Sequence, residues 1–195
     1  MEKLNGKKKL IVSVFISGRG TNLNSLINFS KKKDSPIKIA LVITNNRNAK
    51  GLHFAKKNNI KFLTVNYKNK IKAENKILFN LENYNINLIC LAGFMKILSK
   101  KLIKKYKNRI LNIHPSLLPK YKGLNTHKRV IKNNERFTGC TVHVVNSKLD
   151  SGKIILQKKI RILKKDDENS LSKRVLKIEN FIYPKAIKKF IFSNL

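Results

Sequence analysis

The chain has 195 residues, 42% of them hydrophobic, and a formal net charge of +34, which suits one globular domain with a substantial core. No stretch approaches the ~20 consecutive apolar residues of a membrane span. The N-terminus has no apolar signal region or small-residue cleavage site. Cys90 and Cys140 lie far apart in apolar surroundings, as expected for free thiols in a reducing compartment. We therefore predict a single domain over residues 1–195, with a flexible basic N-terminus at 1–8, no membrane contact and a cytoplasmic location.

The charge alone favours a polyanionic partner, because lysine and arginine neutralise phosphates. Of the 44 basic residues, 37 are lysines, and they are scattered over every segment rather than gathered into a basic patch interleaved with aromatic residues. We interpret the excess as a compositional bias and expect no specific nucleic acid partner, although a nucleic-acid-binding module stays open as an alternative. A positive field should still help to capture a phosphorylated substrate.

The first predicted strand, residues 10–17, is β-branched and nearly all apolar, as in a strand buried on both faces. The run Gly18-Arg19-Gly20-Thr21-Asn22 follows, and then a helical pattern to residue 30. Glycines let the backbone approach an anion, and free N–H groups at a helix start point toward it. Leu23 replaces the third glycine of the dinucleotide fingerprint, and no acid follows the next strand. The pattern predicts a phosphomonoester site; a tight turn without a ligand is the alternative.

Strands and helices alternate through the following segments. Strands are predicted at 37–44, 61–65, 88–91 and 109–113, and helices at 49–58, 71–84 and 99–106. Ile71, Ile77, Leu78 and Leu81 should form the apolar face of the second of these helices, and Ser99 should cap the third. The apolar loop 92–98 lies beyond the carboxyl end of a strand, where doubly wound sheets bind ligands. It either packs against the core or walls a slot for a flat heterocycle.

The central strand ends in Asn112-Ile113-His114-Pro115. Alternate side chains of a strand point the same way, so Asn112 and His114 should share one face, and Pro115 should keep His114 extended. A hydrogen-bond donor beside a group that titrates near neutral pH suits a reaction with a developing oxyanion and a proton transfer. A strand end with an ordinary surface histidine is the alternative.

The last third of the chain changes pattern. A short helix at 125–134 precedes two strands at 140–145 and 153–161 with no helix between them, which indicates an antiparallel hairpin. Asp150 lies in their connector, where its carboxylate could reach a histidine at the end of a neighbouring strand; an ordinary Asp-Ser-Gly turn is the alternative. A final helix should follow residues 166–168, and Pro184 should end or kink it. The fold class predicted is α/β, a single-domain, doubly wound, mostly parallel sheet of about seven strands with a C-terminal antiparallel hairpin and helices on both faces.

Four stretches of the chain resemble the phosphoribosylglycinamide formyltransferase family, a branch of the folate-dependent formyltransferases. They are residues 17–23, 91–98, 111–123 and 139–157, the last with Leu149-Asp150-Ser151-Gly152. The resemblance implies transfer of the formyl group of 10-formyltetrahydrofolate to the amine of 5-phosphoribosylglycinamide in de novo purine (IMP) biosynthesis, without a metal. It implies only these two small molecules as partners, and a monomer or weak homodimer. A formyl-folate sensor or hydrolase is a rival hypothesis that would retain the histidine and the aspartate.

The resemblance also implies roles for individual residues. Asn112, His114 and Asp150 would be the catalytic trio, and we expect Asp150 to raise the pKa of His114 so that the ring stands as an imidazolium. Phosphate and ribose contacts would come from Gly20, Thr21, Asn22, Leu176, Lys177, Ile178 and Glu179, with Glu179 on the ribose hydroxyls. Folate contacts would come from Lys70, Met95, Lys96, Ile97, Leu98, Asn112, Asn146, Ser147, Lys148, Leu149 and Asp150. Lys96, where the family often has arginine, and Leu176, which replaces a polar residue, are departures that bear on affinity rather than on the catalytic groups.

Overall fold

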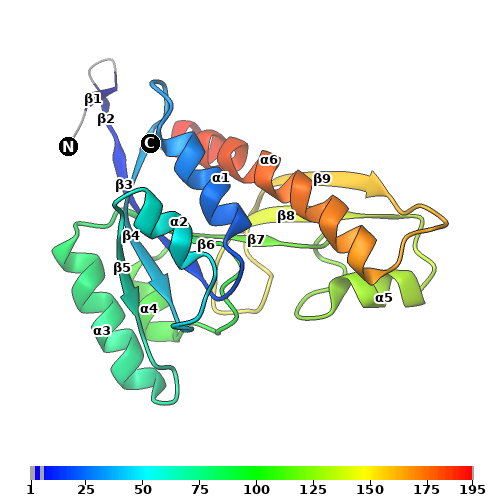
Figure 1. Ribbon diagram of the computed structural model, residues 1–195, viewed down its shortest axis with the longest axis horizontal. Coiled ribbons are helices and arrows are strands. Elements are labelled where there is room, and N and C mark those ends of the chain that lie inside the picture. Colours follow the sequence, from blue (N-terminus) through cyan, green and yellow to red (C-terminus); the bar gives the residue numbers. More distant parts are fainter. Residues whose placement is uncertain (1–2, 5–6, 195) are drawn as a thin grey trace. The chain divides into compact units, whose positions relative to one another are not determined.

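The computed structural model describes residues 3–4 and 7–194 (Figure 1). Part of the segment expected to be flexible, residues 1–2 and 5–6, lies outside the described residues. The remainder forms two short strands, β1 (Lys3–Leu4) and β2 (Lys7–Lys8), which pair antiparallel. The flexibility of residues 1–8 stays a prediction.

The main sheet confirms the predicted fold class. Its seven strands follow the hydrogen-bonded order β5-β4-β3-β6-β7-β8-β9, parallel where β3, β4, β5 and β6 pair and antiparallel between β8 and β9. The chain forms two compact units, residues 1–111 and 112–195, and the boundary falls within β7 (Ile110–His114). The single domain over 1–195 remains a prediction.

In the first unit, β3 (Leu10–Ile16) lies between β4 (Ile37–Thr44) and β6 (Leu88–Leu91), and β5 (Lys61–Thr64) pairs with β4. Strand order therefore reverses at β3, so the loops that leave β3 and β6 flank a topological switch point. The apolar run predicted this central place, since Val12, Val14, Phe15 and Ile16 have no exposed surface. The helices of this unit are α1 (Thr21–Ser30), α2 (Leu52–Lys57), α3 (Lys70–Asn83) and α4 (Lys100–Lys105).

Two helix predictions in this unit had different outcomes. Ser99 caps α4 as expected, accepting a hydrogen bond from the Leu102 N–H at 3.2 Å. The apolar face assigned to α3 was wrong at Ile71, whose side chain is 75% exposed. The buried stripe runs through Ala73, Ile77 and Leu81 at a spacing of four, and a residue two positions before this stripe points to the opposite side of the helix.

In the second unit, β8 (Phe137–Val144) and β9 (Ile154–Arg161) form the predicted antiparallel pair, although β8 begins three residues earlier than expected because Phe137 pairs with Arg161. Two helices, α5 (Thr126–Lys132) and α6 (Glu168–Asn194), complete the unit, and α6 packs against β8, β9 and α5. The expectation that Pro184 could end this helix was wrong. Tyr183, Ala186, Ile187 and Ile191 are buried around the proline, so packing on both sides outweighs the missing backbone donor.

Within residues 3–4 and 7–194, no helix has both the length and the apolar composition needed to cross a bilayer.

Candidate functional site

The end of β7 and the β8–β9 connector form one polar cluster inside the second unit. The Nδ1 atom of His114 lies 3.4 Å from Oδ2 of Asp150, and the two side chains are only 7% and 8% exposed. The third predicted member, Asn112, belongs to the same cluster through His143, whose Nε2 lies 3.2 Å from the Asn112 Nδ2 atom. The structure therefore brings together the three residues whose catalytic roles were inferred from the sequence.

The loop after β7 determines which ring nitrogen of His114 carries hydrogen. The Nε2 atom lies 2.9 Å from the backbone carbonyl oxygen of Tyr121, which can only accept a hydrogen bond. Nε2 must therefore donate, and in the neutral ring Nδ1 is the basic atom. This atom faces Asp150, so a proton gained there would be held beside a carboxylate.

The expectation that the pKa of His114 is raised above its ordinary value is wrong. Burial of the ring lowers the pKa of His114 below its ordinary value and outweighs the opposing effects of the Tyr121 carbonyl and Asp150; His143 and Arg129 add to the lowering. Asp150 does act in the predicted direction, but desolvation is the larger effect. The lowered pKa favours the neutral form of the ring, which can accept a proton.

Asp150 keeps its charge although it is buried. Desolvation raises the pKa of its carboxyl group, but the neighbouring rings of His143 and His114 and the hydrogen bond from the Gly123 N–H bring the pKa below its ordinary value. The Gly123 bond to Oδ2 is 2.9 Å long. A carboxylate held in this way can stabilise positive charge on His114.

His143 is a member of this cluster that sequence reasoning missed. Its Nδ1 donates to the Val144 carbonyl oxygen at 3.0 Å, so in the neutral ring Nε2 accepts from the amide of Asn112. The same Nε2 atom lies 3.7 Å from Oδ1 of Asp150. The available signal was a histidine within the buried strand β8, where His143 is 2% exposed. Because Nε2 of His143 accepts, the amide nitrogen of Asn112, rather than its carbonyl oxygen, faces His143.

The connector that carries Asp150 is held close to the end of β8. A Cβ on Gly152 would lie 1.6 Å from the Val144 carbonyl oxygen, so only glycine allows this approach. Asp150 itself adopts a left-handed backbone conformation with φ 45°. The residues that the resemblance assigned to folate on this connector, Asn146, Ser147, Lys148 and Leu149, are all exposed.

The segment that follows His114 is fixed by side chains from β8 and β9. The Thr141 hydroxyl donates to the Ser116 carbonyl oxygen at 2.6 Å and accepts from the Leu118 N–H at 3.1 Å. The Gln157 amide donates to the Leu118 carbonyl oxygen at 2.7 Å. These hydrogen bonds hold the backbone that directly follows His114 in place.

The predicted phosphate site is the start of α1 in the first unit. Gly20 is the N-cap with φ 73°, and a Cβ there would lie 2.4 Å from the Cα of Gly51. Thr21 and Asn22 begin the helix, whose first-turn N–H groups have no acceptor within the helix. The glycine is required by the turn itself, whether or not an anion binds there.

The loops at the switch point of the first unit are tied together by Ser17. Its N–H donates to the Gly93 carbonyl oxygen at 3.1 Å, and its hydroxyl accepts from the Met95 N–H at 2.8 Å. In the loop predicted to bind folate, Met95 and Ile97 are 65% and 70% exposed, whereas Leu98 is buried. Two large apolar side chains therefore stand in solvent at the carboxyl edge of this sheet.

Of the remaining predicted contacts, Lys70 is exposed as the first residue of α3. On α6, Leu176 and Ile178 are partly exposed, Lys177 is exposed and Glu179 is buried at 7%. Burial, and to a smaller extent the charge of Glu179, raises the pKa of the Cys140 thiol. Among the described residues, no group of three or more His, Cys, Asp or Glu could hold a metal ion.

Comparison with known proteins gives the family. Residues 9–187 match the family model described as formyl transferase. The chain belongs to the formyl transferase family. Within this family it is 43% identical over 187 residues to the phosphoribosylglycinamide formyltransferase of Haemophilus influenzae, with 94% of this chain and 88% of that protein covered. The corresponding enzyme of Brucella melitensis has a crystal structure with a TM-score of 0.90, 39% identity, and coverage of 94% of this chain and 96% of the other.

This formyl transferase also resembles part of a larger protein. It is 40% identical over 185 residues to the human trifunctional purine biosynthetic protein adenosine-3, but it spans only 18% of that protein's length. The bacterial relatives are of similar length to this chain, and with them the chain belongs to the phosphoribosylglycinamide formyltransferases.

Proposed function

We propose that this formyl transferase moves the formyl group of 10-formyltetrahydrofolate to the amine of 5-phosphoribosylglycinamide in IMP biosynthesis. The observation that carries the proposal is the buried cluster of Asn112, His114 and Asp150, with a 3.4 Å approach of the histidine to the carboxylate. The names of the relatives supply the acceptor substrate. Cys90 and Cys140 are buried thiols, which is compatible with a reducing compartment, and we propose the cytosol.

When bound, the folate supplies an activated formyl carbon. The substrate amine attacks this carbon, a C–N bond forms, and the carbonyl electron pair moves onto oxygen. We assign to the Asn112 amide a hydrogen bond to that oxygen, because His143 keeps the Nδ2 donors of Asn112 in a defined orientation. One such donor in a water-poor site is worth on the order of 10²–10³ in rate.

His114 is assigned the proton transfer. Its neutral ring accepts the proton that the amine must lose, and Asp150 stabilises the resulting imidazolium. The proton then passes to the departing folate nitrogen as its bond to the formyl carbon breaks, so the ring ends as it began. General acid–base catalysis of this kind is worth roughly 10²–10⁴ in rate.

Binding of the two substrates is assigned to the residues that the family resemblance names. In the first unit, the N–H groups at Gly20, Thr21 and Asn22 suit a phosphate, and the exposed Met95 and Ile97 suit a flat heterocycle. Lys70, Lys96 and Leu98 are assigned to folate as well. In the second unit, the residues assigned to folate are 146–150, and those assigned to the phosphorylated sugar are Leu176, Lys177, Ile178 and Glu179.

The decisive experiment measures formyl transfer from 10-formyltetrahydrofolate to 5-phosphoribosylglycinamide by the absorbance of the product folate. We expect His114→Ala to lower kcat by about 10²–10⁴, and exposed His53 offers a matched control in His53→Ala. Near wild-type kcat in His114→Ala at saturating folate would contradict the catalytic assignment. Release of formate without the amine acceptor, and no transfer with it, would instead identify a hydrolase.

A further inference from the structure

Tyr121 is held by contacts on both its backbone and its side chain. Its carbonyl oxygen accepts the hydrogen bond from Nε2 of His114, and its backbone has a left-handed φ of 57°, which a tyrosine rarely adopts. Its hydroxyl donates to Oε1 of Glu135 at 2.9 Å and accepts from Nδ2 of Asn133 at 3.0 Å. The guanidinium of Arg129 lies 5.2 Å from the ring centroid. Tyr121 therefore links catalytic His114 to residues at and beyond the end of α5.

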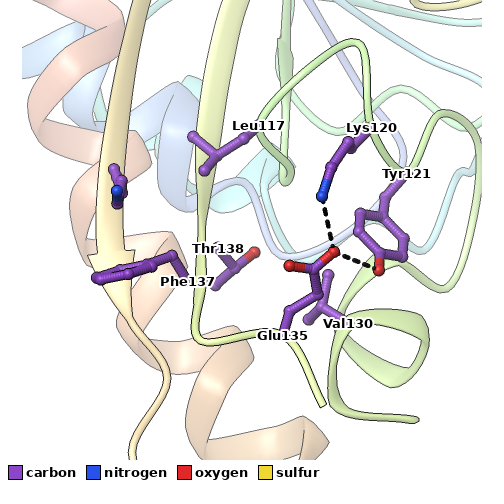
Figure 2. A pocket seen from close by; sticks show the side chains of 8 residues that line it. Leu117, Lys120, Tyr121, Val130, Glu135, Phe137 and Thr138 are labelled. Atoms are coloured by element: carbon purple, nitrogen blue, oxygen red, sulfur yellow. Dashed lines mark hydrogen bonds and ion pairs between the residues drawn. The ribbon is translucent and has the colours of Figure 1, made fainter. Parts of the chain in front are cut away.

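The tyrosine ring borders an open space rather than a packed core (Figure 2). Tyr121 and Glu135 line a cavity of about 210 Å³ together with Leu117, Val130, Phe137 and Thr138. A ring beside such a cavity is not fixed by close packing on that side. In Figure 2 the carboxylate of Glu135 bridges Tyr121 and Lys120, whose Nζ lies 3.1 Å from the same oxygen. Polar contacts at the hydroxyl are therefore the restraint on this side of the ring.

We propose that Glu135 is a positioning residue, which holds the Tyr121 hydroxyl and thereby keeps the Tyr121 carbonyl on Nε2 of His114. The consequence is that Nδ1 remains the basic atom facing Asp150. If the ring swung into the cavity, the strained backbone of Tyr121 would relax and the carbonyl would leave His114. The effect on catalysis rests on the proposed formyl transfer, whereas the effect on the His114 tautomer does not.

Several charged or titratable groups near His114 affect its pKa. Asp150 favours the protonated ring, whereas His143 and Arg129 disfavour it. The charge of His114 in turn lowers the pKa of His127. Glu135 is not among these groups, so it should act through the geometry of Tyr121.

The test compares Glu135→Ala, Glu135→Gln and Tyr121→Phe with wild type. A glutamine keeps an oxygen that accepts from the Tyr121 hydroxyl, so Glu135→Gln should retain function. Glu135→Ala and Tyr121→Phe both remove the hydrogen bond between these two side chains, and each should lower kcat by about three- to tenfold, with KM changes of less than about twofold. Glu82→Ala is the control, since exposed Glu82 pairs with Lys105 at 2.8 Å in the first unit.

The second readout is the ¹⁵N spectrum of the histidine rings in the substrate-free protein. We expect the Nε2–H tautomer of His114 in wild type, Glu135→Gln and Glu82→Ala, and a growing share of Nδ1–H in Glu135→Ala and Tyr121→Phe. An unchanged tautomer in both of the latter variants would overturn the inference, as would equal losses in Glu135→Gln and Glu135→Ala. Because the tautomer is measured without substrates, it decides the positioning role even if formyl transfer is absent.

Discussion

His143→Ala is the substitution that best tests how the cluster works. In the native protein the ring of His143 joins two groups, donating to the Val144 carbonyl oxygen at 3.0 Å and accepting from the Asn112 amide at 3.2 Å. Alanine removes both contacts and leaves a gap at a position that is 2% exposed. No proposed catalytic group is deleted.

The magnitudes follow from these contacts. Two lost hydrogen bonds at about 0.5–1.5 kcal/mol each, with the emptied volume, should reduce the free energy of unfolding by about 2–4 kcal/mol. The Asn112 amide, free to rotate, would present its donors to the oxyanion only part of the time. An oxyanion donor contributes on the order of 10²–10³, so kcat should fall by about 10–100-fold. His143→Gln, whose amide oxygen can still accept from Asn112, should lose less.

Urea unfolding gives the stability, and the folate absorbance assay gives kcat and KM for both substrates. Measurements below the melting temperature of each variant separate loss of fold from loss of catalysis. If His143→Ala unfolded at a lower urea concentration but kept kcat within about threefold of wild type, the orientation of Asn112 by His143 would be disproved, since its proposed contribution is larger.

Three further predictions concern charge and backbone. Asp150→Asn should lower kcat by about 10²–10⁴ in the same assay, because the imidazolium of His114 loses its partner; a kcat near that of wild type would contradict the role of the carboxylate. The pKa values of His114 and His127 are lowered in the folded protein, so these two rings bind protons more weakly in the folded than in the unfolded chain. The free energy of unfolding should therefore be highest above about pH 6.5 and fall as the solution is acidified below it, which urea titrations at several pH values would measure; a constant value from pH 7 to 5 would refute this. Finally, Gly20→Ala should be much more destabilising than Gly93→Ala in thermal melts. Both glycines have positive φ, but a Cβ at Gly20 meets a neighbouring Cα at 2.4 Å whereas one at Gly93 meets nothing within 4 Å; equal losses would show that the turn relaxes.

The inner strands of the sheet were predictable because burial leaves most of their residues apolar. Residues 37–44 and 88–91 were predicted with the bounds that the structure has. Helix ends were less accurate, and Pro184 shows why. Local chemistry favours a stop there, but the buried residues beyond the proline stabilise ten more residues of α6.

The candidate site was predictable as a set of residues but not as a set of interactions. The alternation of side chains along a strand predicted that Asn112 and His114 share one face. The position of Asp150 in the connector between two strands predicted that its carboxylate could reach a histidine. Neither pattern shows how deeply the histidine is buried, and burial determines the direction of its pKa shift. Likewise, His143 in a β-branched strand looks like a packing residue until the register of β8 places it against Asn112 and Asp150.

The backbone of the site explains why its geometry depends on distant contacts. Tyr121, Gly123 and Asp150 all have positive φ, at 57°, 77° and 45°, and two of the three are not glycine. In residues other than glycine such conformations cost on the order of 1–3 kcal/mol each and persist only where surrounding contacts enforce them. Here the Gly123 N–H binds Asp150, and the Tyr121 carbonyl binds His114, so each of the two strained residues, Tyr121 and Asp150, takes part in a contact that orients the pair proposed to be catalytic. Relief of the strain would release both partners, which is why residues such as Glu135, without a place in the chemistry, should influence its rate.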